Sequence, residues 1–191
     1  GLTVYRALKN AGVRAGQRVA IFGIGGLGHL AVQIAHAWGA EVIALDVDPA
    51  KLSFAKELGA VHAFNAADAN DIKSLRKLGG AHVAVVTSAA KAAYDTAFKC
   101  LRPGGTISVV GLPADPLMFS ALGLVSQEAR VMGSSVGTRE DMRAVLDMAA
   151  QGQLRCRTET QPLDQVNAVF ERMRRGQILG RVVLTCRGIH V

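Results

Sequence analysis

Three closely spaced glycines and a later aspartate are the residues whose types and spacing point most directly to chemistry. Gly23, Gly25 and Gly28 follow an apolar stretch, and Asp46 stands eighteen residues beyond Gly28. In that order the glycines would permit a tight turn, let the backbone approach a pyrophosphate, and let a helix pack closely on a strand. The Asp46 carboxylate can accept hydrogen bonds from both hydroxyls of an adenosine ribose. The negative charge of Asp46 would repel a 2′-phosphate, and the next residue is Val47 rather than an arginine that could bind one. The pattern therefore predicts a dinucleotide site that favours NAD over NADP.

The elements around the glycines decide how much this pattern means, because a glycine motif alone is weak evidence. Apolar residues 19–22 predict a buried strand before the glycines, residues 28–38 predict a helix after them, and residues 42–45 predict a second strand that ends at Asp46. The start of the helix would offer free N–H groups and the positive end of its dipole to phosphates. The simpler alternative is a glycine-rich turn that binds no ligand.

The rest of the chain continues this alternation of strands and helices. The expected strands are 18–23, 41–46, 61–64, 82–87, 105–110 and 129–134, and the expected helices are 3–11, 28–38, one from Pro49 to just before Gly59, 68–78, 91–101 and 138–150. An Arg102-Pro-Gly-Gly105 turn is expected before the fifth strand. Helices between successive strands require crossover connections and hence a parallel sheet. We therefore predict an α/β fold with a doubly wound, six-stranded parallel sheet (a Rossmann fold), which binds its ligand at the carboxyl ends of the strands.

The regular alternation of strands and helices ends after Gly152, so we expect the chain to have two parts. Residues 1–152 are predicted to form the dinucleotide-binding domain, and residues 153–191 a separate C-terminal segment. That segment contains an expected extended stretch at 155–161, a helix at 163–174 and a last strand at 181–185. Because the sheet is already complete, this segment is expected to pack on something else.

Bulk properties exclude several classes of function. The net charge is +7, but the basic residues are spread along the chain, so we expect no nucleic-acid binding. No apolar run approaches the roughly 20 residues of a membrane span, so no membrane association is expected. Cys100, Cys156 and Cys186 lie too far apart in sequence for a metal motif or a disulfide framework, which favours a reducing, cytoplasmic location. The chain starts at Gly1 rather than Met and an amphipathic helix is expected almost at once, which suggests a fragment of a longer protein.

Six short segments together carry a resemblance to a known family. They are Gly1-Leu-Thr-Val-Tyr5, Gly23-Ile-Gly-Gly-Leu-Gly-His29, Asp46-Val-Asp-Pro-Ala-Lys51, Arg102-Pro-Gly-Gly105, Gly133-Ser-Ser-Val-Gly-Thr-Arg139 and Gly176-Gln-Ile-Leu-Gly-Arg181. With them the chain resembles, over essentially all of its length, the coenzyme-binding half of the zinc-dependent medium-chain alcohol dehydrogenases, in particular the bacterial and yeast-type ethanol enzymes.

The resemblance implies which residues hold NAD. Beside Gly23 and Gly28 of the glycine pattern, it assigns Gly25, Gly26 and Leu27 to the pyrophosphate and nicotinamide ribose, and Arg181 to the pyrophosphate. Asp46 and Lys51 would hold the adenosine ribose. The nicotinamide end would be lined by Thr87, Val110, Leu112, Ser134 and Val136, with Thr3 beneath the ring. Several of these residues have ordinary alternatives. Lys51 could be a solvated helix residue, Thr87 could simply end a strand, and Val110 and Leu112 could be core residues. His29, in the first turn of the helix, could contact phosphate, but we expect an exposed histidine there.

The resemblance also implies what lies outside these residues. In the family a catalytic zinc held by two cysteines and a histidine polarises the alcohol or carbonyl oxygen. The histidines at 29, 36, 62, 82 and 190 and the three cysteines show no spacing that could replace those ligands. We therefore expect no catalytic residue and no metal site in this chain, and expect residues 153–191 to return to a GroES-like catalytic domain.

The parent enzyme would transfer a hydride between a primary alcohol or aldehyde and NAD. It would form a homo-oligomer, with residues 129–134 as the candidate edge strand. Two alternatives remain open: a stand-alone, non-catalytic dinucleotide-binding module or sensor, and a zinc-free relative of the quinone reductases. The latter usually favours NADPH, against which Asp46 argues.

Overall fold

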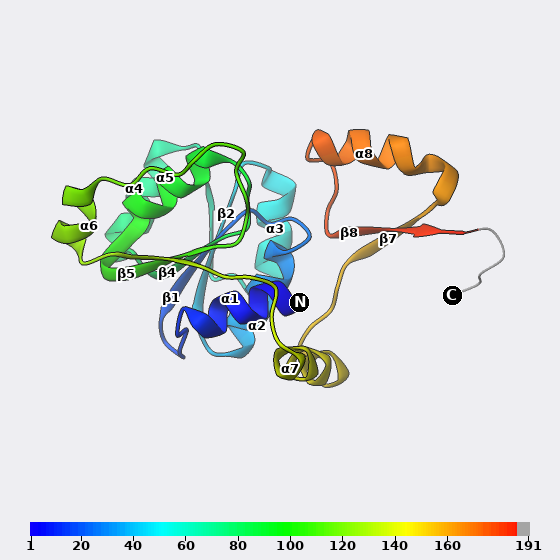
Figure 1. Cartoon of the computed structure of the whole chain (residues 1–191), viewed down its shortest axis with the longest axis horizontal. Helices are drawn as coiled ribbons and strands as arrows, with labels where there is room; N and C mark the ends of the chain where they lie inside the picture. Colours follow the sequence, from blue (N-terminus) through cyan, green and yellow to red (C-terminus); the bar gives the residue numbers. More distant parts are fainter. Residues whose placement is uncertain (187–191) are drawn as a thin grey trace.

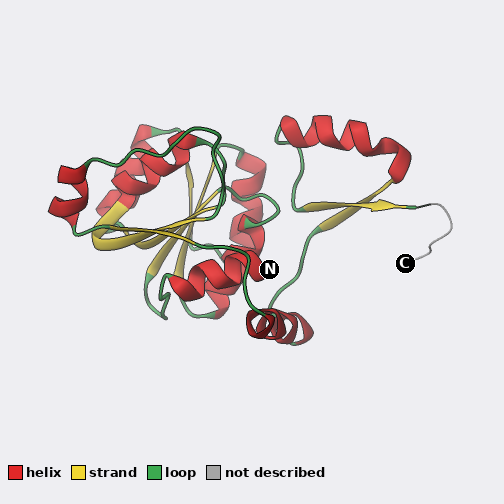
Figure 2. Cartoon of the chain, in the orientation of Figure 1, coloured by secondary structure: helices red, strands yellow, loops and turns green. Residues whose placement is uncertain are grey.

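A computed structural model describes residues 1–186 of the chain. Its centre is a parallel sheet with helices on both faces (Figures 1 and 2). In spatial order its six strands are β3 (His62–Asn65), β2 (Glu41–Asp46), β1 (Arg18–Phe22), β4 (Ala81–Val86), β5 (Leu101–Val109) and β6 (Arg130–Gly133). The chain winds outward from β1 to β3 and then returns to continue at β4 beside β1. The prediction of a doubly wound, six-stranded parallel sheet is confirmed.

Seven helices accompany this sheet. They are α1 (Leu2–Asn10), α2 (Gly28–Ala37), α3 (Pro49–Glu57), α4 (Ala69–Lys77), α5 (Lys91–Cys100), α6 (Ala121–Gln127) and α7 (Arg139–Ala150). Side chains of α1, α2, α3 and α7 share one core cluster, and those of α4 and α5 share the other. The two clusters lie on opposite faces of the sheet. No helix within residues 1–186 is long and apolar enough to cross a membrane.

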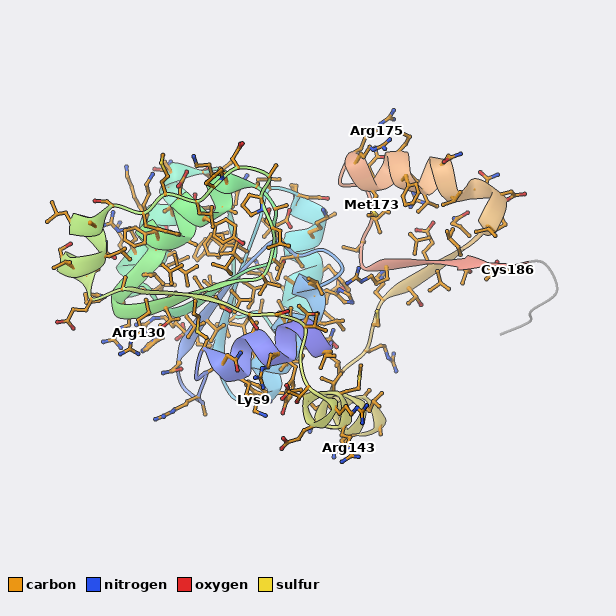
Figure 3. All side chains as sticks on the ribbon, in the orientation of Figure 1. Lys9, Arg130, Arg143, Met173, Arg175 and Cys186 are labelled. Atoms are coloured by element: carbon orange, nitrogen blue, oxygen red, sulfur yellow. The ribbon has the colours of Figure 1, made fainter. Side chains whose placement is uncertain are left out.

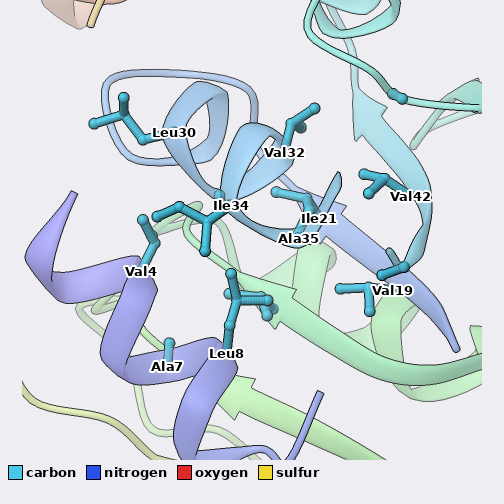
Figure 4. Close-up of a cluster of buried hydrophobic side chains, with 14 of the residues drawn as sticks. Val4, Ala7, Leu8, Val19, Ile21, Leu30, Val32, Ile34, Ala35 and Val42 are labelled. Atoms are coloured by element: carbon cyan, nitrogen blue, oxygen red, sulfur yellow. The ribbon is translucent and has the colours of Figure 1, made fainter. Parts of the chain in front are cut away.

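The two cores follow from the alternation of side chains along the central strands. In β1, Val19 and Ile21 join the first cluster while Ala20 and Phe22 join the second. Successive side chains of a strand point to opposite faces, so a strand covered on both sides must be apolar throughout. Figure 4 shows Val19 and Ile21 of β1 packed with residues of α1 and α2. This packing holds the start of α2 firmly above the end of β1.

An ionic contact attaches α7 to α1 on the same side of the sheet. The fully buried Asp141 carboxylate accepts hydrogen bonds from Arg6 (3.1 Å) and Lys9 (2.9 Å) of α1. It also accepts the backbone N–H of Thr138, whose hydroxyl in turn accepts the N–H of Asp141, which completes a capping box. The Thr138 N–H and the Lys9 ammonium hold the pKa of Asp141 well below its ordinary value.

Most predicted elements lie within two residues of the observed ones, and two differences stand out. β5 begins at Leu101, not at Gly105, because the pairing with β4 resumes after a register shift that leaves the exposed residues 102–104 outside the ladder. Helix α6 was not predicted. It has no buried residue, so it lacks the apolar periodicity by which a helix is recognised in a sequence.

Beyond α7 the chain forms a second, smaller sheet, which we call the C-terminal unit (residues 158–185). It consists of β7 (Thr158–Pro162), the 3₁₀ turn Leu163–Gln165, α8 (Val166–Arg174) and β8 (Arg181–Thr185), with β7 and β8 parallel. Two hydrogen bonds of 2.7 and 2.9 Å join the Arg172 guanidinium to the Glu159 carboxylate and fasten α8 to β7. Figure 1 shows this unit projecting to one side of the main sheet. His190 lies outside the described residues.

Candidate functional site

The turn between β1 and α2 brings the predicted glycines into one tight loop. Gly23 has a φ of +90°, a conformation that other residues rarely adopt. A Cβ on Gly28 would stand only 1.8 Å from the Gly23 carbonyl oxygen, so only glycine allows α2 to start this close to β1. A Cβ on Gly25, by contrast, would meet nothing within 4 Å. The loop therefore has an open side at Gly25, where a ligand can come close to the backbone.

Asp46, at the end of β2, faces this loop and is tied to it. One carboxylate oxygen accepts the Ile24 N–H at 2.7 Å, and the other accepts the N–H groups of Val47 (2.8 Å) and Asp48 (3.1 Å). An ionised carboxylate offers about four acceptor positions, so it retains capacity for a further donor. Asp46 thus both fixes the glycine loop and presents a partly exposed negative charge beside it.

A cavity of about 200 Å³ opens next to Asp46 at the carboxyl ends of the strands. Its lining residues are Phe22, Gly23, Leu45, Asp46, Val47, Ala66, Ala67, Ser88, Ala90, Ala92, Ala93 and Thr96. The walls are mostly small and apolar, which suits a flat aromatic group. Sequence reasoning missed the alanines that follow β3 and β4. Their signal was a run of small residues at strand ends that already pointed to a site.

Two cations lie on the other side of the glycine loop. The Arg181 side chain, from the start of β8, lies directly against Gly26: its Nε would be 2.5 Å from a Cβ at that position. Lys51 of α3 and Arg181 line one cavity of about 340 Å³ together with Gly25 and Gly26. Within residues 1–186 neither cation forms an ion pair. This arrangement can receive an anionic group at the start of α2.

His29 differs from its prediction, because it is fully buried rather than exposed. Its Nδ1 bonds the Gly25 carbonyl oxygen at 2.8 Å, and its Nε2 bonds the Arg157 N–H at 3.3 Å. A carbonyl can only accept and an N–H can only donate, so the ring is neutral, with its proton on Nδ1. Burial, opposed in part by the Gly25 carbonyl, lowers the pKa of His29. Sequence reasoning could not find this role, because Arg157 lies 128 positions away.

Gln33, one helical turn further along α2, continues the same attachment. Its side-chain oxygen accepts the Arg155 N–H at 2.8 Å, and its side-chain nitrogen donates to the Arg155 carbonyl at 3.0 Å. Residues i and i+4 lie on one face of a helix, so His29 and Gln33 together hold residues 155–157 along α2. This attachment leads into the C-terminal unit that carries Arg181.

The residues predicted for the nicotinamide end have mixed surroundings. The Thr87 hydroxyl donates a hydrogen bond to the Gly23 carbonyl oxygen at 2.7 Å. Val110 packs partly against the core, whereas Leu112 is 82% exposed. The Ser134 hydroxyl oxygen is buried and has no hydrogen-bond partner within the described chain. Val136 has a φ of +30°, a strained backbone for a β-branched residue.

Ser134 and Val136 follow the end of β6, so they lie at the carboxyl ends of the strands, where the ligand is expected. Thr3 is half-buried on α1. An unpaired buried hydroxyl and a strained backbone are both costly. Such costs are typical of places that a ligand completes.

Comparison with known proteins shows the family of this chain. The sequence profile of the zinc-binding dehydrogenases matches residues 26–151. The chain belongs to this family. Two alcohol dehydrogenases, from Geobacillus stearothermophilus and from Moraxella sp., are each 45% identical over 96% of the chain. The chain spans about half the length of these curated relatives, 55% in both cases.

Two solved structures have the same fold. The alcohol dehydrogenase of the archaeon Aeropyrum pernix superposes with a TM-score of 0.91 at 37% identity, over 96% of this chain and 55% of that one. Acetophenone reductase from Geotrichum candidum, solved in complex with NAD, superposes with a TM-score of 0.86 at 31% identity, over 96% of this chain and 52% of that one.

The zinc that gives the family its name does not fit the residues described here. Within residues 1–186 no group of three or more histidine, cysteine or acidic side chains could hold a metal ion. Cys100 is buried, and burial raises the pKa of its thiol to about 11. A thiol that resists ionisation is a poor zinc ligand. Within residues 1–186, this member of the family therefore offers a candidate nucleotide site but no cluster of metal ligands.

Proposed function

We propose that this chain is the NAD-binding part of an alcohol dehydrogenase, which transfers a hydride between a primary alcohol or aldehyde and NAD. The observation that carries the proposal is Asp46, which holds the glycine loop through the Ile24 N–H and still faces an apolar cavity. A ribose needs such an acceptor beside a slot for its base. A 2′-phosphate would meet the same negative charge, which favours NAD over NADP.

The other residues of the site fit the remaining parts of NAD. Gly25, Gly26, Leu27 and Gly28 would present backbone N–H groups to the pyrophosphate. Gly23 would form the tight turn, because its own N–H is bonded to the Leu45 carbonyl. Arg181 and Lys51 would supply positive charge there, and the apolar cavity would take the adenine. When bound, NAD supplies the hydride acceptor. This chain's own residues bind it, orient it and exclude water from it.

At the far end we propose that Ser134 and Val136, with Val110 and Leu112, would line the nicotinamide. The buried Ser134 hydroxyl would gain the partner that it lacks within the described chain. Thr87 would act indirectly, because its hydroxyl is already held by the Gly23 carbonyl. Thr3 would pack beneath the ring.

The proposal for the whole protein follows the relatives. Residues 1–152 would form the NAD-binding domain, and residues 153–191 would pack toward a GroES-like domain that carries the zinc ligands. The half-buried and exposed apolar side chains of the C-terminal unit, among them Phe170, Met173 and Val183, would be covered there. We further propose a cytoplasmic enzyme that forms homo-oligomers through β6, the exposed edge strand of the sheet.

Calorimetric titration with NADH and with NADPH tests the proposal, followed by a metal assay on the same sample. We expect saturable NADH binding, at least about tenfold weaker NADPH binding, and no bound zinc. Arg181→Gln should weaken NADH binding, whereas Arg143→Gln, an exposed arginine on α7, should not. Equal affinity for both nucleotides, or binding that is indifferent to Arg181, would contradict the assigned site.

A further inference from the structure

The strands of the sheet begin at the end opposite the proposed NAD site, and several basic residues lie at these strand starts. Arg18 opens β1, Arg130 opens β6, and His82 and Arg102 are the second residues of β4 and β5. These four strands are neighbours in the order β1-β4-β5-β6. Parallel strands all begin at the same edge, so their first residues gather there. Arg130 lies beside Thr106 in the ladder, and Thr106 lies beside Val83.

A cavity of about 340 Å³ opens at this edge, separate from the proposed NAD site. It is lined by Ala11, Gly12, Arg14, Gln17, His82, Val83, Arg102, Pro103, Gly104, Thr106 and Arg130. The loop from α1 to β1 supplies Arg14 and Gln17, and the segment that leaves the β4–β5 ladder supplies Arg102. The lining contains three arginines and no carboxylate. None of the three arginines forms an ion pair within residues 1–186.

His82 adds a hydrogen-bond donor to this cavity. Its Nδ1 accepts the Arg18 N–H at 3.1 Å, so a neutral ring must carry its proton on Nε2. No partner for Nε2 lies among the described residues. Burial, and next the charges of Arg102 and Arg18, lower the pKa of His82, while Glu41 raises it. Glu41 is itself bonded to His62 at 3.2 Å. The local field at His82 is therefore positive, with nothing in the cavity wall to balance it.

We propose that this cavity is a second anion site, which binds a small ligand through a phosphate group. Guanidinium groups present forked donors that match phosphate oxygens, and three of them line one hollow here. The three arginines are exposed but gather around one cavity. A local cluster of this kind favours a compact ligand over a nucleic acid, which would need a basic stripe. The phosphate could be a free anion or part of a phosphate ester. This site and the proposed NAD site lie at opposite ends of the strands.

Amide NMR of the ¹⁵N-labelled chain can separate the two sites during titration with inorganic pyrophosphate or with glycerol 3-phosphate. We expect saturable shifts at Gly12, Gln17 and Gly104, independent of any shifts at Gly25 and Gly26. The Arg102→Gln/Arg130→Gln double variant should weaken the first set at least about tenfold. The matched Arg143→Gln/Arg175→Gln variant removes the same charge elsewhere; Figure 3 shows Arg130 and Arg143 well apart. Circular dichroism melts confirm that both variants fold.

These titrations test the second anion site independently of NAD binding. Saturation by pyrophosphate alone would indicate a free anion, and saturation by glycerol 3-phosphate as well would indicate a phosphate ester. No saturable shift at Gly12, Gln17 and Gly104 with either probe would overturn the site. Equal weakening by the two double variants would also overturn it, because it would reduce the effect to net charge. A shift confined to Gly25 and Gly26 would support the proposed function while refuting the second site.

Discussion

The buried imidazole of His29 accepts the backbone N–H of Arg157 at 3.3 Å. Through its other nitrogen the same ring holds the carbonyl of Gly25, in the glycine loop. One side chain therefore connects the loop that we propose holds pyrophosphate with the segment that leads to Arg181. The segment continues to Arg181, because the Arg157 carbonyl accepts the Arg181 N–H at 2.9 Å and the Arg181 side chain lies against Gly26.

Replacing His29 with alanine should release the segment around Arg157. The change leaves the Arg157 N–H without its partner, opens a cavity at a fully buried position and removes the ring contact with Phe54. We therefore expect a loss of about 2–4 kcal/mol in the free energy of unfolding. Limited trypsin digestion should cut faster after Arg155 and Arg157. His36→Ala, an exposed position on the same helix, serves as the control. Unchanged cleavage in His29→Ala would show that the imidazole does not hold the segment.

The free energy of unfolding should fall as the pH falls from about 7.5 to about 5.5. Folding lowers the pKa of His29 and of His82 below the ordinary value of 6.5. The unfolded chain therefore takes up these protons first, and stability that is complete above pH 6.5 is lost as the folded pKa values are approached. Urea unfolding at several pH values measures the slope. His29→Gln should reduce the slope and leave the part due to His82; an unchanged slope would exclude His29 as its source.

A second acidic step should follow, because Asp141 and Glu159 have pKa values below their ordinary ones. Arg172 and Gln161 lower the pKa of Glu159 to about 2. These carboxylates stabilise the folded chain above their unfolded pKa values and lose that effect as the pH falls below about 4. Arg172→Gln should weaken the step, and the same urea titrations extended downward would detect it. A step of equal size in Arg172→Gln would assign it to other carboxylates.

Alanine at Gly28 and alanine at Gly25 should have opposite consequences. At Gly28 the new Cβ would overlap the Gly23 carbonyl, so we expect about 3 kcal/mol of destabilisation. At Gly25 it would enter open space, so stability should change by less than about 0.5 kcal/mol. NADH affinity should nevertheless fall about tenfold for Gly25→Ala, because the methyl group occupies the ligand side of the loop. Thermal melts and calorimetry separate the two effects; normal NADH binding by Gly25→Ala would mean that the ligand does not approach there.

Substitutions at Asp46 should change the choice of nucleotide. Asp46→Gly should weaken NADH binding by about 1–3 kcal/mol, the scale of losing hydrogen bonds to a charged acceptor. Asp46→Asn keeps an oxygen for the Ile24 N–H but removes the charge, so its preference for NADH over NADPH should shrink. Asp95→Asn, an exposed position on α5, is the matched control. A preference that survives in Asp46→Asn would place the selectivity elsewhere.

The sequence predicted best the strands and helices whose apolar residues form a clear run or period. β2 begins and ends at the predicted residues, because an apolar run bounded by polar residues is unambiguous for a buried strand. β8 also has its predicted bounds, although none of its residues is buried. α6 was missed because it buries nothing, and the start of β5 was misplaced because a ladder with a register shift looks like a turn.

The candidate site was predicted where its chemistry is local and missed where it depends on distant contacts. The glycine loop and Asp46 share a short stretch of chain, so their spacing alone brings them together. The attachment of residues 155–157 to His29 and Gln33 joins positions more than a hundred residues apart. No local pattern encodes such a pairing, and an isolated histidine at the start of a helix is more often solvated.

The hydrogen bonds from Gln33 reach only the main chain of Arg155, its N–H and its carbonyl. The side chain of Arg155 is exposed and contributes nothing to them. Position 155 should consequently tolerate almost any substitution during evolution, with proline as the exception because it has no N–H. The selective constraint at this junction falls on Gln33. In an alignment of related chains, position 33 should therefore be an invariant glutamine, while position 155 varies freely.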